Sequence, residues 1–254
     1  MVTLRSIFLM FFVCLPAQAN NTPLEQNVFK LGTSVKSLLL KYYHVQADEG
    51  NGELVMALQQ RLKDGEQLHQ QIQQQLPGRY MQQSQNVKQH WATFNQHLQT
   101  NLSEIRESAF PELQVVTLMR QAANDMVSEL DSLSALLQQH EEITLSAAEH
   151  WSRQQKRLLL QVVERYIERA ASSMGAPLSV DGPSLNELAA QFEQGLKAYP
   201  QQQASAGAKA ALNRIRGQWL FIEKSTSNES ARLVPYLVMR YTDSILARLD
   251  TLAA

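Results

Sequence analysis

Apolar residues recur at intervals of three and four positions from Thr22 to the C-terminus, with few helix breakers between them. This spacing places the apolar side chains along one stripe of an α-helix, which must then be buried against other helices. The 254 residues include only 10 Gly and 8 Pro, which disfavours a turn-rich all-β fold. The sequence therefore predicts an all-α protein.

Gly, Pro and polar clusters predict where the helices end. Breaks are expected at residues 48–52, Pro77-Gly78, Pro111, residues 175–183 and Pro200. Neither Gly nor Pro occurs from Glu112 to Met174, an interval of 63 residues. An unbroken helix of this length would extend for roughly 90 Å and would pass from one bundle into another. The alternative is a short interruption near Ile143-Thr144, where two β-branched residues lower the helix propensity.

The two halves of the chain are similar to each other. Residues 36–41 (KSLLLK) match residues 156–161 (KRLLLQ), and later apolar positions match in the same order at offsets of 119 to 130 residues. Trp91 and Trp219 are equivalent in this comparison, and both are expected to be core anchors. The pattern indicates a duplicated unit of four helices.

Four amphipathic helices joined by short loops bury their apolar stripes together as a bundle. The sequence thus predicts two tandem four-helix bundles, at residues 20–140 and 141–254. The boundary between them is expected inside a shared, continuous or slightly kinked helix.

The first 19 residues have the pattern of a secretory signal peptide. Arg5 supplies a positive start, residues 7–15 are apolar, and Ala17-Gln18-Ala19 places small residues at the cleavage site. The apolar run is shorter than the roughly twenty residues that span a membrane; an uncleaved anchor is the alternative. Cleavage after Ala19 would remove Cys14, the single cysteine, so that the mature chain would lack disulfides and thiolate ligands. These features predict a soluble periplasmic protein.

Charge and motif content exclude several classes of function. The 23 basic residues are balanced by 24 acidic residues, which argues against a nucleic-acid binder. No glycine-rich phosphate loop, serine-centred elbow or redox pair is present, so neither an enzyme nor a cofactor is predicted. His90 and His97 are expected to share a helix face, but a metal site there would need a third ligand from another helix. No metal site is predicted.

Three features of the second half carry a resemblance to a known family: residues 147–161, residues 192–196 and Trp219. They resemble the PilJ/NarX-like periplasmic sensor module of type IV pilus chemotaxis transducers and nitrate/nitrite sensors. That module opens with a helix of the form Ala-Gly-x-x-Arg-Met-Leu-Ser-Gln-Arg, and its third helix has a central Trp. The match is degenerate, because Leu158 replaces the Met of the motif and Val162 replaces its second Arg.

The resemblance implies a ligand site. In the nitrate sensors, arginines on this helix of paired subunits hold the anion, and by position only Arg157 inherits this role here. Lys156 and Arg153 are supporting charges by proximity. A guanidinium suits a planar anion because it offers a fork of donors. The alternative is that Arg157 is a solvated or salt-bridged helix residue, paired with Glu164 or Glu149.

The sequence predicts a non-enzymatic sensory or regulatory protein. It is expected to bind a small solute such as an anion, or a partner's helices, and to pass a change in helix packing to a membrane-bound signalling protein such as a kinase, cyclase or chemotaxis transducer. Modules of this family often pair in parallel, which implies a homodimer. The alternative function is a structural or assembly factor, a scaffold for an envelope appendage or a secretion system with a Gln-rich contact face.

Overall fold

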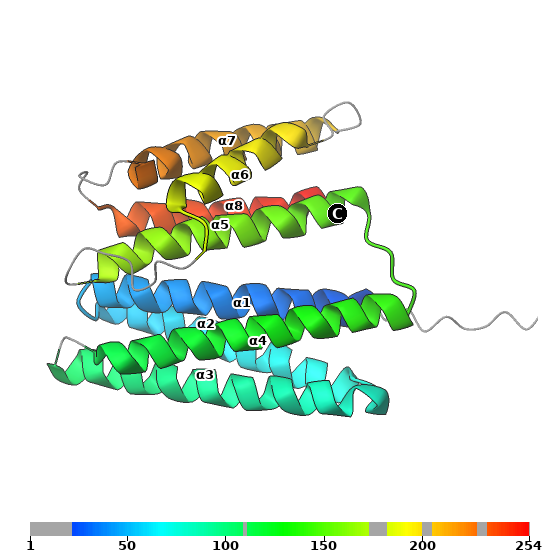
Figure 1. Cartoon of the computed structure of the whole chain (residues 1–254). Coiled ribbons are helices and arrows are strands. Elements are labelled where there is room, and N and C mark those ends of the chain that lie inside the picture. The colour runs from blue at the N-terminus through cyan, green and yellow to red at the C-terminus, as the bar shows by residue number, and fades with distance from the viewer. Residues whose placement is uncertain (1–21, 109–110, 173–181, 200–204, 228–232, 254) are drawn as a thin grey trace, which may run out of the picture.

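A computed structural model of the chain describes residues 22–108, 111–172, 182–199, 205–227 and 233–253 (Figure 1). Within these residues every regular element is helical, which confirms the all-α prediction. The elements are α1 (Thr22–Ala47), α2 (Gly52–Gln75), the 3₁₀ turn η1 (Gly78–Tyr80), α3 (Met81–Ser108), α4 (Leu113–His140), α5 (Ala147–Ala171), α6 (Leu185–Ala198), α7 (Ala206–Ser227) and α8 (Pro235–Ala253). The predicted signal peptide lies outside the described residues.

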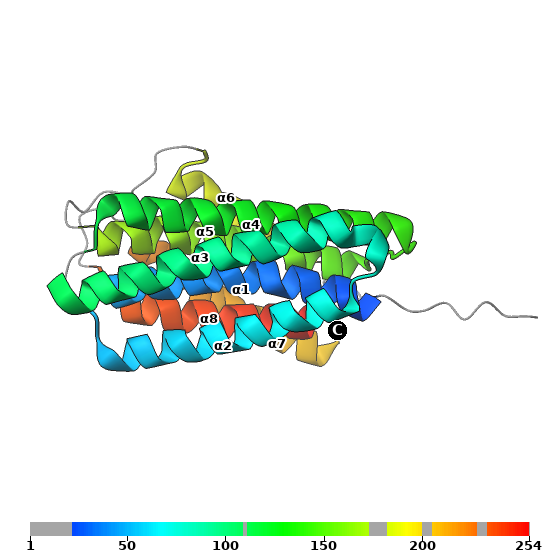
Figure 2. The ribbon, with the colours of Figure 1, turned by 90° about the horizontal axis from the view of Figure 1, so that it is seen from below.

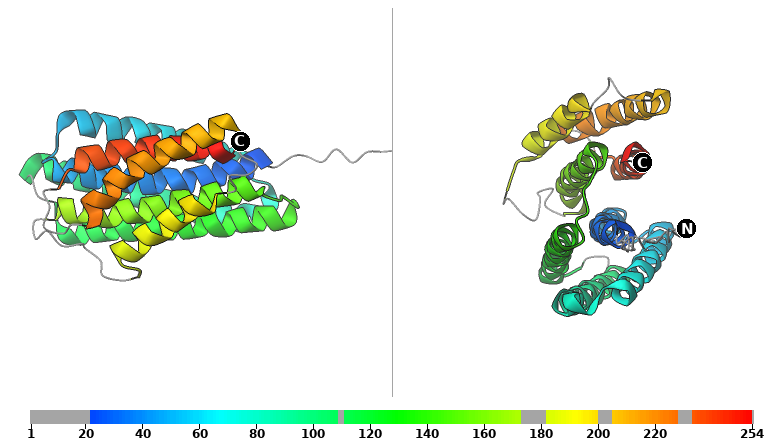
Figure 3. Two further views of the ribbon diagram at one scale, coloured as in Figure 1. Left: turned by 90° about the horizontal axis from the view of Figure 1, so that it is seen from above. Right: turned by 90° about the vertical axis from the view of Figure 1, so that its right-hand side faces the viewer.

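The helices lie along one common direction, and successive helices run antiparallel (Figure 1). Seen end on, they stack in pairs: α2 with α3, then α1 with α4, then α5 with α8, then α6 with α7 (Figure 3). The same pairings occur in the first set, α1–α4, and in the second set, α5–α8. In each set the first helix packs on the second and fourth, and the third packs on the fourth. The two sets meet mainly where α1 packs along α5.

The triple Leu of α1 explains why this helix is central. Leu38, Leu39 and Leu40 are all at most 1% exposed. Consecutive helix residues point about 100° apart, so three buried neighbours require packing on several sides. Helix α1 has this surrounding because α2, α4, α5 and α8 all pack against it (Figure 2).

The predicted shared helix between the two sets is wrong, and the alternative interruption near Ile143-Thr144 is confirmed. Helix α4 ends at His140, Glu142 adopts a left-handed conformation with φ of 52°, and α5 begins after Ser146. The Ser146 side chain accepts a hydrogen bond from the Glu149 backbone, and the Glu149 carboxylate accepts one from the Ser146 backbone, which forms a capping box. Helix α5 therefore folds back antiparallel to α4, and the two sets lie side by side.

Both tryptophans of the repeat are buried. Trp91 is 4% exposed and stacks on His69 of α2, with ring centroids 5.3 Å apart. Trp219 is 3% exposed and packs on Phe192 of α6, with centroids 4.4 Å apart. Each Trp thus joins the third helix of its set to the second, as expected for core anchors.

None of the helices in the described ranges combines the length and apolarity needed to cross a lipid bilayer.

Candidate functional site

The three cations predicted as ligand residues meet at one point of the contact between α1 and α5. Arg153, Lys156 and Arg157 occupy one face of α5, since residues three and four positions apart are neighbours on a helix. All three surround the ring of Phe29 on α1. Their charged ends lie 4.5, 5.7 and 5.4 Å from the ring centroid, respectively, within the range of cation–π attraction. These four residues are called the Phe29 cluster below.

Arg153 forms a buried ion pair with Glu25 of α1. Its Nη1 and Nη2 donate to the two carboxylate oxygens at 2.5 and 2.7 Å, and Glu25 is completely buried. Ser134 and Gln138 of α4 donate to the same carboxylate at 2.6 and 2.8 Å. Burial opposes ionisation of Glu25, but these hydrogen bonds outweigh it and hold its pKa below the usual value. The network links α1, α4 and α5.

The other two cations are paired with carboxylates of two further helices. Lys156, whose side chain is almost buried, pairs with Asp250 of α8. Arg157 pairs with Asp131 of α4, and both side chains are about half exposed. Arg157 is thus a salt-bridged, partly solvated helix residue, as the alternative expected. Its partner is not Glu164 or Glu149, however, since Glu164 pairs with Lys36 of α1 and Glu149 caps α5 at Ser146. Each cation of the cluster is therefore neutralised by a carboxylate from a different helix.

Two cavities lined by Arg153 flank the Phe29 cluster. A cavity of about 470 Å³ lies between α1, α5 and α8, and is lined by Gln26, Phe29, Lys30, Glu149, Ser152, Arg153, Lys156 and Asp250. A cavity of about 410 Å³ lies between α4 and α5, and is lined by Asp131, Ser134, Ala135, Gln138, Leu145, His150, Arg153, Gln154 and Arg157. The second, called the α4-side cavity below, reaches the Arg157–Asp131 pair, so a small solute can approach that pair from solvent.

A second polar cluster lies in the same interface, toward the C-terminal ends of α1 and α5. Glu168 of α5 is 1% exposed and accepts a hydrogen bond from the Tyr43 hydroxyl of α1 at 3.3 Å. The Arg120 guanidinium of α4 lies 3.8 Å from Oε1 of Glu168. The other carboxylate oxygen of Glu168, Oε2, makes no hydrogen bond to any described residue. Burial, followed by the neighbouring charge of Glu164, raises the pKa of Glu168 to about 7. Nothing in the sequence points to this group, since an acidic residue beside an apolar stripe gives no signal of its burial.

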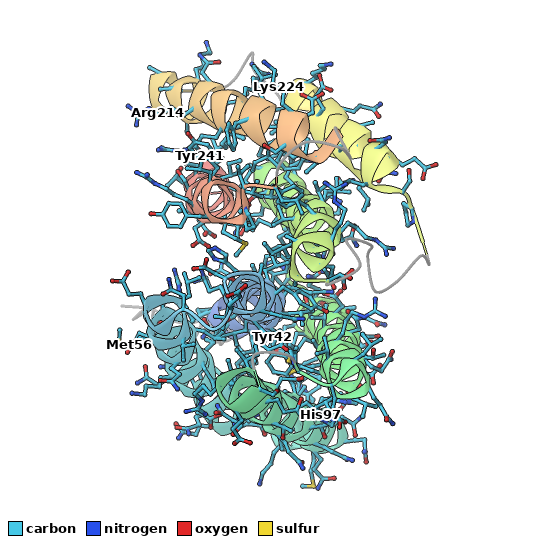
Figure 4. All side chains as sticks on the ribbon, turned by 90° about the vertical axis from the view of Figure 1, so that its left-hand side faces the viewer. Tyr42, Met56, His97, Arg214, Lys224 and Tyr241 are labelled. Carbon is cyan, nitrogen blue, oxygen red and sulfur yellow. The ribbon has the colours of Figure 1, made fainter. Side chains whose placement is uncertain are left out.

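The remaining predicted candidates do not form a metal site in the described part of the chain. His90 and His97 are half-buried on α3, and His97 lies on the outside of the first set, whereas Tyr42 points into its interior (Figure 4). The described residues contain no group of three His, Cys, Asp or Glu side chains that could hold a metal ion.

Comparisons with known proteins do not identify a family. No family model matches the chain, and neither a curated protein nor a solved structure matches it. The resemblance to the sensor module stays a prediction from the sequence. Function is therefore inferred from the contacts between α1 and the helices around it.

Proposed function

We propose that the chain is a non-enzymatic sensory or regulatory protein of the periplasm that binds a small anion at the Phe29 cluster. The observation that carries this proposal is the convergence of Arg153, Lys156 and Arg157 on one aromatic ring, with each cation tied to a different helix. An anion that competes for one of these cations weakens one link between helices. Binding and helix packing are then coupled by the same contact.

Arg157 is the residue at which an anion enters. Its pair with Asp131 is half exposed, and exposed ion pairs contribute at most about 1 kcal/mol. A small anion can therefore replace Asp131 at low cost. Arg153 is a different case, because its buried pair with Glu25 is held by two further hydrogen bonds. We assign Arg153 a positioning role and Arg157 the ligand role.

The contact that an anion would displace, between Arg157 and Asp131, joins α4 of the first set to α5 of the second. A ligand changes a protein's conformation only if it binds one arrangement better than the other. Here an anion favours the arrangement in which Asp131 has released Arg157. A membrane-bound signalling protein, such as a kinase, cyclase or chemotaxis transducer, would read the resulting shift of the two sets.

The test is calorimetric titration of the chain from Asn20 onward with nitrate, the anion that the family resemblance implies. Arg157→Gln should lower the affinity by at least about tenfold, since a charge-assisted hydrogen bond is lost. Arg214→Gln on α7, exposed and remote from the cluster (Figure 4), should leave it unchanged.

Equal nitrate affinity in wild type and Arg157→Gln would refute the anion site. Capture experiments with envelope extracts separate the two functional classes. Recovery of a kinase, cyclase or chemotaxis transducer favours the regulatory role. Recovery of appendage or secretion components, unaffected by Arg157→Gln, would instead favour the scaffold.

A further inference from the structure

A third cavity, of about 260 Å³, lies along α1 between α2 and α8. The side of α1 that faces this space forms its floor, Arg61 enters from α2, and Leu246 and Ala247 form part of the α8 wall. The end-on view shows α2 and α8 on either side of α1 at this place (Figure 3). This cavity is called the α1 groove.

The α1 groove is the counterpart of the α4-side cavity in the repeat. Lys30, Thr33, Ser34 and Ser37 all line the groove. The triple-Leu helices of the two halves are offset by 120 residues. Adding 120 to each of these residue numbers gives His150, Arg153, Gln154 and Arg157, which all line the α4-side cavity. Asp250 of the groove corresponds to Asp131 in the same way, at the offset of 119 found for the last helices. The duplicated fold thus builds a pair of related cavities, one on each side of the α1–α5 contact.

The groove differs from its counterpart in having cations that are not neutralised. No described carboxylate lies within ion-pair distance of Lys30 or Arg61, and both side chains are exposed. The two lining carboxylates are already engaged, Asp243 with Lys41 at 2.8 Å and Asp250 with Lys156. The groove therefore attracts negative charge without any competing contact to break.

Hydroxyl donors line the same groove as these cations. Ser34 and Ser37 are half-buried on the floor, and their hydroxyls make no hydrogen bond to a described residue. Thr33 is different, since its hydroxyl donates to the Phe29 carbonyl at 3.2 Å. Two unengaged hydroxyls beside two unpaired cations suit the oxygens of a carboxylate.

Apart from Lys156, which is paired with Asp250, the rest of the lining is apolar. Phe29 and Leu38 on the floor and Leu246 and Ala247 on the wall offer hydrocarbon surface next to the charged end. The volume corresponds to about nine waters at about 30 Å³ each, so a ligand of six to nine heavy atoms fits roughly. We propose that the α1 groove binds a small carboxylic acid anion with a hydrocarbon body, its carboxylate held by Arg61, Lys30 and the Ser34 and Ser37 hydroxyls.

The groove shares Phe29 and Lys156 with the Phe29 cluster, but it does not include Arg157, and calorimetry distinguishes binding at the two places. The probe is hexanoate, titrated into the chain from Asn20 onward. Wild type should bind it with a Kd below about 10 mM. Arg61→Gln should weaken binding at least about tenfold and Ser37→Ala about threefold, by loss of charge-assisted donors. Lys63→Gln, which removes an exposed cation two residues further along α2, should bind as wild type does.

Two further probes define the ligand class. Hexanamide has the same body without the charge, and inorganic phosphate has charge without a body; both should bind at least about tenfold more weakly than hexanoate. The proposal is overturned if hexanoate does not bind, if either probe binds equally well, or if Arg61→Gln has no effect. A loss in Arg157→Gln alone would place hexanoate at the Phe29 cluster instead. Circular dichroism confirms that each variant is folded.

Discussion

Replacing Arg153 with Met tests whether the buried ion pair holds the two sets together. The substitution leaves the Glu25 carboxylate completely buried, with only Ser134 and Gln138 as donors. Removing one partner of a buried pair costs about 3–5 kcal/mol, because the remaining charge is not compensated. The whole fold is expected to be stable by about 5–15 kcal/mol. Arg153→Met should therefore remove a large share of the free energy of unfolding.

Arg157→Met is the matched control. It removes a cation from the same helix and from the same aromatic ring, but its pair with Asp131 is half exposed. Such pairs contribute at most about 1 kcal/mol. The difference between the two variants thus isolates the buried Glu25 network from the loss of a cation–π contact.

Equilibrium urea unfolding, followed by circular dichroism, gives both free energies. The double variant Glu25→Gln/Arg153→Met should be more stable than Arg153→Met, since no buried charge is left uncompensated. The reasoning would be refuted if the free energies of unfolding of Arg153→Met and Arg157→Met differed by less than about 1 kcal/mol. So would a double variant no more stable than Arg153→Met.

Three further predictions concern other parts of the chain. Burial raises the pKa of Glu168 to about 7, so the folded state favours the neutral carboxyl. The contribution of this group to the free energy of unfolding is therefore full below about pH 4.5 and is lost as the pH rises through 7. Glu168→Gln should therefore stabilise the protein at pH 8 relative to wild type, as measured by urea unfolding at pH 5 and 8; an unchanged pH dependence would contradict this. A Cβ on Gly65 would lie 2.9 Å from the Trp91 ring, so Gly65→Ala should lower the free energy of unfolding by about 1–3 kcal/mol. Gly52 has open space around it, so Gly52→Ala should cause no such loss. Equal effects of the two substitutions would argue against the tight contact. Expression of the full chain with export should give an intact mass that begins at Asn20, and retention of residues 1–19 would instead favour the uncleaved anchor.

The helical fold was predictable because the apolar stripes and the breakers both act locally. The break between α4 and α5 was only one of two expectations, since no Gly or Pro marks it. A local signal did exist: Ser146 and Glu149 have the spacing of a capping box, which starts a helix at Ala147. This spacing favours the interruption over the shared helix, although Ser152 and Gln155 have the same spacing inside α5.

Only the cations of the candidate site were predictable from the sequence. The three cations lie close together in the sequence, so one helix had to carry them. Their carboxylate partners belong to α1, α4 and α8, and the Arg153–Glu25 pair is separated by 128 residues. Such pairs depend on how whole helices pack, which apolar periodicity does not specify. The place of Phe29 is unpredictable for the same reason, because an aromatic residue in an apolar stripe gives no sign of the cations around it.

The central claim is that an anion exchanges with Asp131 and thereby shifts the two sets of helices. Spin labels at the exposed positions Gln89 of α3 and Asn213 of α7 would report the separation of the sets, because the chain from Asn20 has no native cysteine. Double electron–electron resonance should show a changed distribution of distances between the two labels when nitrate is added to the wild type, and no change in Arg157→Gln. An identical distribution with and without saturating nitrate in wild type would contradict the claim.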